Sequence, residues 1–402
     1  MIRYVPARWW LTTVLLWSTQ IIVLISGNAL NFALIWQLAG LTNSAQSVLW
    51  AAALTLVPSV IIAPFAGVLS DRLSRRRVLM IAEGLALLSL AVLWGVERIS
   101  NMWLLYAVLV WRATATVFYQ TAFQATLPQL IPAQHYQRLS GMQQMVMGIS
   151  SLLTPVLGAL IVEEYGLPWA VTTTAIVLLL SLVILALLEL PQPNGTLVTR
   201  WQDDVRDMRH IYGQRRGLWQ LLLAAVVLNM CVLPVFSLLP YLVSVYFDTG
   251  AWLLAWLEIS GGIGLVLGAV LLAVWGGFRR AVHTMLAAVA LLIVALLWLS
   301  LVPATAPLWI LGSVLLIGWA AAWAHGPLLT MVQRTISASM HGRAMALLNA
   351  SMNVAAPVGL VVSGAVVERI GHQIWAIGVI VCIVTLLAWV LRSDVMTLED
   401  AP

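Results

Sequence analysis

The sequence contains no lysine: all 20 of its basic residues are arginine. A P-loop ATPase needs the lysine of its phosphate-binding loop, and retinal pumps and pyridoxal enzymes need a lysine for their Schiff base. The H-E-x-x-H pattern of zinc peptidases does not occur in the sequence either. We therefore expect a protein that is not an enzyme, has no cofactor, and draws any uphill work from an ion gradient, the substrate's own gradient or a partner.

Cysteine and charge are also scarce. The two cysteines, Cys231 and Cys382, both lie in apolar runs, so their positions predict neither a disulfide framework nor a metal site. Charged residues make up 9% of the chain, against about 25% in soluble domains. A soluble core could not bury a chain that is 62% hydrophobic, so the excess must face a lipid bilayer. The net charge of +5 is spread over loops, which indicates membrane topology and not nucleic-acid binding.

The apolar residues fall into about twelve runs, and a membrane-spanning helix needs about 20 apolar residues. The runs are continuous rather than alternating, which predicts helices and not a β-barrel. They are Trp10–Leu38, Val48–Leu69, Val78–Val96, Met102–Leu127, Met142–Val162, Trp169–Leu190, Leu218–Phe247, Leu253–Trp275, Val282–Leu301, Leu308–Val332, Ala344–Val367 and Ile374–Leu391.

The arginines between these runs predict the orientation. Nearly all of them lie on one side, and the opposite side has Arg98 and Arg369 among several acids. The arginine-rich side is expected to be cytoplasmic. We therefore expect both termini in the cytoplasm. The first run is too long for the apolar part of a signal peptide, so we expect a first helix that is retained rather than cleaved. We also expect a monomer in the inner membrane.

One polar segment divides the chain into two groups of six runs. It occupies residues 191–217 and opens with the helix breakers Pro191 and Pro193. Apolar residues from Val205 to Tyr212 recur at helical spacing, which favours an amphipathic helix on the membrane surface over a disordered linker. The predicted domains are residues 1–190, this linker, and residues 218–402.

The two groups of runs resemble each other. Thr154-Pro155-Val-Leu-Gly158 in the fifth run is similar to Ala356-Pro357-Val-Gly359 in the eleventh. These patterns lie about 200 positions apart, near half the chain length, as an internal duplication predicts. Chance similarity between helices rich in alanine, glycine and valine is the alternative.

The loop after the second run carries a dense charge motif. It reads Gly67-Val-Leu-Ser-Asp71-Arg72-Leu-Ser-Arg75-Arg76-Arg77. A positively charged cytoplasmic loop is the simpler interpretation. The acid–base order, however, is similar to the loop signature of the major facilitator superfamily, except at Ser74, where that family usually has glycine. A second copy, at 276–280, keeps two arginines and no acid.

With this loop, the twelve runs and the repeat, the chain resembles the major facilitator superfamily over essentially its whole length. The resemblance implies an all-α membrane protein with twelve transmembrane helices in two pseudo-symmetric six-helix bundles. It also implies gating by the signature loop. The gating residues would be Gly67, Asp71, Arg72, Arg75 and Arg76.

A finer resemblance is to the drug-efflux branch that contains macrolide exporters and the enterobactin exporter. It rests on the segment 28–36, on Arg112 in the fourth run, on Leu130-Ile131-Pro132, and on the partial antiporter motif at Thr154 to Gly158. It implies export of a drug or secondary metabolite, an amphipathic organic compound, by proton antiport with alternating access. The alternatives are transport of a siderophore or lysolipid, and a non-transporting sensor or scaffold on the same fold.

Three residues of the Asp, Glu, Lys and Arg types lie well inside the runs, where each costs at least about 2.5–3.5 kcal/mol and so needs a reason. Arg112 is expected either to couple transport or to clamp helices together. Glu258 is the favoured proton carrier because it is far from any arginine in the sequence, although it could stay hydrated near the outer mouth. Glu83 is the second candidate, and its alternative is an ion pair with Arg75 or Arg76 at the inner surface.

Polar residues on the first, seventh and eleventh runs are candidate contacts for a small-molecule substrate, and a deep tryptophan could stack on it. The alternative is hydrogen bonding between helices, worth roughly 0.6 kcal/mol per bond. The candidates are Gln20, Asn28, Asn31, Trp36, Asn229, Asn349 and Asn353. Protons and the lipid bilayer are the other expected partners. In the eighth run, glycines from Gly261 to Gly268 predict a small-residue face for close helix packing.

Overall fold

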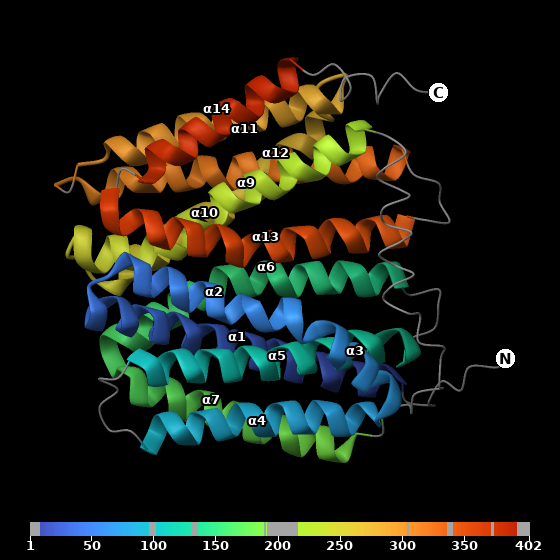
Figure 1. Ribbon diagram of the computed structural model, residues 1–402. Helices are drawn as coiled ribbons and strands as arrows, with labels where there is room; N and C mark the ends of the chain where they lie inside the picture. Colours follow the sequence, from blue (N-terminus) through green and yellow to red (C-terminus); the bar gives the residue numbers. More distant parts are fainter. Residues whose placement is uncertain are drawn as a thin grey trace. The chain divides into compact units, whose positions relative to one another are not determined.

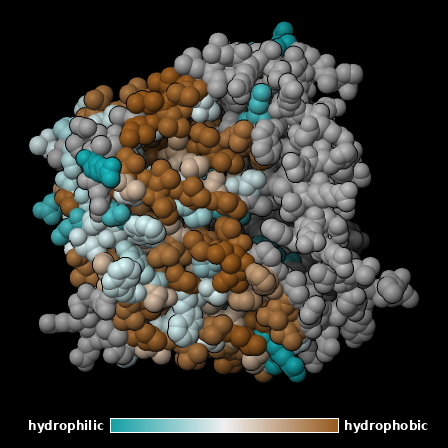
Figure 2. Space-filling model, in the orientation of Figure 1, coloured by the Kyte–Doolittle hydropathy of each residue, from teal (hydrophilic) through white to brown (hydrophobic). Residues whose placement is uncertain are grey.

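The computed structural model describes residues 9–95, 102–130, 136–188, 190, 216–303, 305–335, 341–370 and 374–391. In these ranges every regular element is a helix and none is a strand (Figure 1). Eight helices of the described part are long and apolar enough to cross a membrane, and two more apolar helices are shorter. Figure 2 shows hydrophobic side chains gathered over much of the described surface on one face. Such a surface suits lipid, as the composition predicted.

The chain forms two compact units. The first comprises Met1–Asn43, Leu54–Val198 and Gly250–Ala255, and the second comprises Ser44–Ala53, Thr199–Thr249 and Trp256–Pro402. The predicted linker lies almost wholly outside the described residues, as do both termini. The boundaries of the predicted domains and the amphipathic helix therefore stay predictions.

The helices of the first half follow the first six apolar runs. They are α1 (Trp9–Thr42), α2 (Ala45–Ile61), α3 (Ala63–Arg72), α4 (Arg75–Gly95), α5 (Met102–Leu130), α6 (Tyr136–Leu160), the π-helical turn η2 (Ile161–Tyr165) and α7 (Leu167–Leu187). The second run is divided between α2 and α3, with proline in the first turn of α3. Backbone hydrogen bonds continue across the division, from Ile62 N to Pro58 O and from Ala66 N to Ile62 O, so the two segments act as one span.

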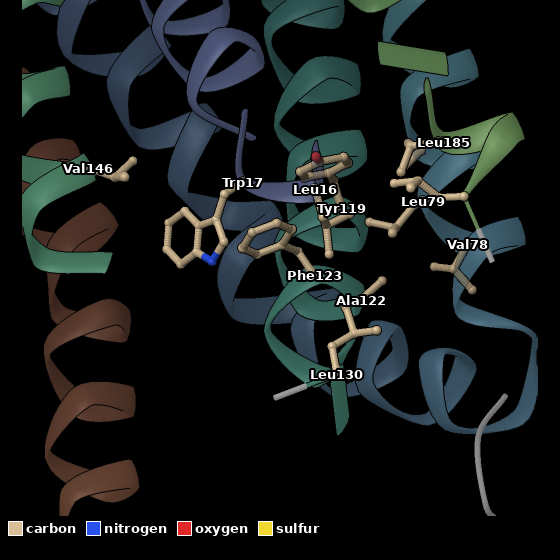
Figure 3. Close-up of a cluster of buried hydrophobic side chains, with 12 residues drawn as sticks. Leu16, Trp17, Val78, Leu79, Tyr119, Ala122, Phe123, Leu130, Val146 and Leu185 are labelled. Atoms are coloured by element: carbon tan, nitrogen blue, oxygen red, sulfur yellow. The ribbon is translucent and has the colours of Figure 1, made fainter. Parts of the chain in front are cut away.

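Aromatic side chains of α1 and α5 form the centre of the core of the first unit (Figure 3). The rings of Trp17 and Phe123 meet edge to face at 5.6 Å, and those of Tyr119 and Phe123 stack at 6.1 Å. Such pairs contribute about 0.5–1.5 kcal/mol beyond their buried area. Leu79 of α4 and Leu185 of α7 belong to the same cluster. This core therefore holds together the four helices that carry the candidate site.

The helices of the second half follow the remaining six runs. They are α9 (Arg216–Tyr241), the π-helical turn η3 (Leu242–Tyr246), α10 (Ala251–Trp275), α11 (Ala281–Leu301), the 3₁₀ turn η4 (Pro307–Trp309), α12 (Ile310–Thr335), α13 (His341–Ile370) and α14 (Ile374–Leu391). In the second unit α9 packs against α13 and α14, and α11 packs against α12 and α14.

The predicted small-residue face of α10 packs against α12. A Cβ at Gly264 would overlap the carbonyl oxygen of Leu315, and a Cβ at Gly268 would lie 2.9 Å from the carbonyl oxygen of Trp319. At Gly261 a Cβ would lie 2.8 Å from a ring atom of Phe236. Side chains larger than glycine would push these backbones apart. The prediction is confirmed for these three glycines.

The two similar Pro–Gly patterns make equivalent contacts, each inside its own half. A Cβ at Gly158 of α6 would lie 2.7 Å from the ring of Phe32 in α1, and a Cβ at Gly359 of α13 would lie 2.9 Å from the Cα of Met230 in α9. In the first half the glycine lets α6 lie against α1, and in the second half the glycine lets α13 lie against α9. This supports the predicted duplication.

The turns that follow the first helix of each half also match. Asn43 follows α1 and Asp248 comes shortly after η3, and both have a φ of 48°. Asparagine and aspartate adopt this left-handed conformation more readily than other residues with a Cβ. They lie about 200 positions apart, the spacing that the duplication predicts.

We expect Gly359→Ala to lower the thermal stability of the purified protein. The new Cβ would meet Met230 backbone atoms at 2.9 and 3.1 Å, and overpacking of this kind costs about 1–3 kcal/mol. The matched control is Gly84→Ala in α4, where a Cβ would meet nothing within 4 Å. Alanine there should be neutral or stabilising. Thermal unfolding followed by tryptophan fluorescence in detergent measures both, and equal melting temperatures would contradict the close contact.

Candidate functional site

A buried guanidinium joins α5 to α1. Arg112 of α5 is only 7% exposed. Its Nε donates a hydrogen bond to Asn31 Oδ1 at 3.4 Å, and its Nη2 donates to the carbonyl oxygen of Gly27 at 3.3 Å. A charge in apolar surroundings needs such partners. The expected clamp between helices is therefore present, and it uses two donors of the guanidinium.

The polar residues of α1 lie along one cavity of the first unit. Its volume is about 90 Å³. Gln20, Asn28 and Asn31 line it from α1, together with Glu83 of α4 and Arg112 of α5. The sequence had placed the first three with the substrate and the last two with proton coupling. The structure brings these five members of the two predicted groups to one cavity.

Glu83 is buried in this wall and is only 2% exposed. The hydroxyl of Ser181 in α7 donates a hydrogen bond to its Oε1 at 2.6 Å, and its Oε2 has no hydrogen-bond partner among the described residues. The alternative expected from the sequence, an ion pair with Arg75 or Arg76 at the surface, is wrong for this structure. The reason is depth, because Glu83 lies two turns beyond the start of α4 and packs inward against α7.

Two more polar bonds attach α1 to its neighbours. Thr174 of α7 donates to the carbonyl oxygen of Ser26 at 3.3 Å. The Asn28 side chain donates to Ser150 of α6 at 3.5 Å. Together with the Arg112 bonds, they connect α1 to α5, α6 and α7. The helix that carries the polar face is thus connected to three neighbours beside the cavity.

The remaining predicted site residues lie elsewhere. Trp36 lines a second, apolar cavity of the first unit, which Val162 also lines. Asn229 of α9 is half-buried and Asn353 of α13 is exposed, both in the second unit, and the side chain of Asn349 lies outside the described atoms. Glu258 is half-buried in α10, also in the second unit.

The signature loop joins α3 to α4. A Cβ at Gly67 would meet no described atom within 4 Å. The side chains of Asp71 and Arg72 lie outside the description. Arg75 is 4% exposed, and Arg76 Nη2 donates to the carbonyl oxygen of Ala186 in the last turn of α7. A cation at the C-terminal end of a helix donates to a carbonyl that has no partner within the helix, and it interacts favourably with the negative end of the helix dipole.

Ser181, Thr174 and Tyr119 belong to the site, and no pattern in the sequence predicted them. Ser181 and Thr174 lie in a strongly apolar helix, where a hydroxyl usually bonds to a carbonyl of its own helix. Thr172 and Thr173 of α7 do so. Tyr119 lines the cavity and also belongs to the aromatic core. The packing of α7 against α1 and α4 identifies Ser181 and Thr174, and the packing of α5 against α1 and α4 identifies Tyr119.

The size of the cavity limits what it can hold. Pockets for drug-sized ligands occupy about 300–1,000 Å³. The cavity has about 90 Å³, which accommodates several water molecules, since one needs about 10–15 Å³ on this measure. A cavity of this size can hold water, and it is too small for a drug-sized molecule.

Comparison with solved structures agrees with this fold. The nucleoside transporter NupG has a TM-score of 0.70 and 13% identity, covering 97% of this chain and 100% of that chain. A D-xylose-proton symporter has a TM-score of 0.68 and 16% identity, covering 92% of this chain and 96% of that chain. At these identities the likeness shows the fold, and it confirms the predicted all-α membrane architecture.

Comparison of sequences identifies the family. The chain is 24% identical over 373 residues to macrolide efflux protein A of Streptococcus pyogenes, covering 92% of each protein. It is 23% identical over 312 residues to macrolide efflux protein A of Enterococcus faecalis, covering 76% of this chain and 97% of that protein. The profile of the Major Facilitator Superfamily matches residues 16–282. Because this match covers more than half of the chain, the chain belongs to the major facilitator superfamily of membrane transporters.

Proposed function

We propose that this transporter exports amphipathic organic compounds in exchange for protons, by alternating access. It acts as a monomer in the cytoplasmic membrane, with both termini in the cytoplasm. Macrolides are the first class to test, because two similar proteins bear the name macrolide efflux protein A. The observation that carries the proposal is the cavity that Glu83 and Arg112 share on the polar face of α1.

The cavity is better suited to proton coupling than to holding the substrate. Its volume of about 90 Å³ fits water and a moving proton. Gln20, Asn28 and Asn31 would contact a drug-sized substrate only in a state in which the cavity is wider. Alternating access supplies such states, because the bundles of these transporters rock about a site near the midplane.

Glu83 is the proton carrier that the geometry supports best. It shares its cavity with Arg112, and one carboxyl oxygen has no partner among the described residues. An unpaired carboxylate charge buried in this way is costly, so a proton on Glu83 removes that cost. Glu258, which the sequence favoured, lies in the second unit, and the sequence alone could not show which acid lies beside Arg112.

Arg112 is less suited to binding an anionic substrate than its charge suggests. Its Nε and Nη2 already donate to Asn31 and Gly27. A siderophore, which is usually anionic, would have to reach the remaining N–H donors of a side chain that is only 7% exposed. This favours an amphipathic compound over the siderophore alternative, with Arg112 positioning α1 beside Glu83.

We expect Glu83→Gln to abolish uphill export and to leave downhill exchange intact. The amide is close in shape to the carboxyl group and cannot carry a proton across the membrane. In inside-out vesicles with an imposed pH gradient, accumulation of a labelled macrolide should fall to the level seen without a gradient. Glu258→Gln is the matched control and should keep gradient-driven accumulation.

Two results would contradict this account in different ways. If Glu83→Gln retains uphill export and Glu258→Gln loses it, the proton carrier lies in the second unit. If the unmodified protein shows no gradient-driven flux of any compound in a chemically varied panel, the export proposal itself fails. The sensor or scaffold alternative would then be favoured.

The signature loop gives a separate expectation about gating. Asp71 lies at the end of α3, followed by the arginines that begin α4. We propose that it stabilises the outward-open state by keeping the cytoplasmic side closed. Asp71→Asn should increase the inward-facing population and slow turnover while substrate still binds. Spin-label distance distributions across the cytoplasmic side measure this, and distributions identical to those of the unmodified protein would rule out the role.

A further inference from the structure

The first turns of α2 and α10 each belong to the unit that is formed mainly by the other half of the chain. Ser44–Ala53, which includes the start of α2, lies in the second unit, and Gly250–Ala255, which includes the start of α10, lies in the first. Both exchanges come shortly after the left-handed turns at Asn43 and Asp248, so they occur at equivalent points of the two halves. Each of these helices therefore starts in one unit and continues in the other.

A carboxylate of the first unit holds the start of α10. Glu163 lies in the π-helical turn η2, and its Oε1 accepts a hydrogen bond from the backbone amide of Ala251, the first residue of α10. The amides in the first turn of a helix have no partner within that helix, and a negative charge is favourable beside them. Glu163 therefore caps α10 from a different element, at a residue that is fully buried.

The residue before α10 makes room for this carboxylate. A Cβ at Gly250 would lie 2.6 Å from Glu163 Oε1 and 3.4 Å from its Cδ. A larger residue at this position would push the carboxylate away from the Ala251 amide. The acid also lies in a π-helical turn, an irregularity that is frequent at functional sites. The contact thus depends on an acid, a glycine and a buried amide from two separate segments.

The start of α10 is held in a different way from the start of α2. In the second unit, a Cβ at Gly364 of α13 would lie 3.5 Å from the Cβ of Leu49 in α2, and Leu49 is fully buried, so this attachment is apolar packing. In the first unit, the attachment uses the charge of Glu163, which is exposed. Water can solvate an exposed carboxylate when it leaves its partner, so the bond to α10 can break at low cost.

We propose that Glu163 is a releasable anchor for α10 that keeps the outer side of the transporter closed. This role rests on the alternating access of the proposed function. While Glu163 accepts from Ala251, the first turn of α10 stays in the first unit. When the carboxylate leaves, that turn moves with the rest of α10 and the outer side opens. Asp71 acts in the opposite sense, on the cytoplasmic side.

Two variants remove the anchor in different ways. Glu163→Ala removes the hydrogen-bond acceptor, and Gly250→Ala keeps the acceptor and displaces it. The matched control for the acid is Glu164→Ala, because Glu164 is the next residue of η2 and is equally exposed. The matched control for the glycine is Gly40→Ala in α1, where a Cβ would meet nothing within 4 Å.

Hydrogen–deuterium exchange of the full chain in lipid nanodiscs, without substrate, measures the anchor directly. We expect the amides of residues 251–254 to exchange roughly fivefold faster in Glu163→Ala and in Gly250→Ala, a change typical of a lost helix cap. Both control variants should exchange like the unmodified protein. Unchanged exchange in Glu163→Ala would overturn the anchor itself.

Spin-label distance distributions across the cytoplasmic side distinguish gating from helix capping alone. Release of the anchor favours the outward-open state, so Glu163→Ala should lower the inward-facing population, a shift opposite in sign to that expected for Asp71→Asn. Faster exchange with an unchanged distribution would show that Glu163 only caps α10, and it would overturn the gating role. Neither measurement needs transport, so an absence of flux for every compound tested would reject the export proposal without deciding this one.

Discussion

The candidate site depends on the solvation of one buried guanidinium by the first helix. Arg112 keeps its charge, so apolar surroundings would be prohibitive without hydrogen-bond acceptors. Asn31 and the carbonyl oxygen of Gly27 supply them. Because both acceptors lie on α1, the contact fixes α5 against the polar face of that helix. The cavity between these helices follows from this arrangement.

The same constraint explains the neighbouring acid. Glu83 lies at the same cavity without an ion pair among the described side chains, and its visible partner is the neutral hydroxyl of Ser181. An acid and a base that line one cavity without pairing leave the acid able to gain or lose a proton. A tight ion pair would hold Glu83 in one charge state. We infer that the site is arranged for exchange and that its rigidity comes from α1, α5 and α7.

The sequence predicted the architecture well, because a membrane leaves few options. The twelve apolar runs correspond to the described helices, and the glycines of α10 do pack closely, since only small residues let helix backbones approach in lipid. The site could be predicted only in part. Arg112 and Glu83 are visible as charges in apolar runs, but their common cavity depends on how α4, α5 and α7 surround α1. Ser181 gives no signal because a serine in a helix usually bonds to its own backbone.

The central claim is that Glu83 exchanges a proton when substrate binds. Infrared difference spectroscopy of the purified protein, with and without a macrolide, observes the carbonyl stretch of a protonated carboxyl group directly. The account predicts a carboxyl band that changes on substrate addition, disappears in Glu83→Gln and persists in Glu258→Gln. In Ser181→Ala the band should shift, because the hydroxyl donor to Oε1 is lost. A substrate-sensitive band that survives unchanged in Glu83→Gln would contradict the account.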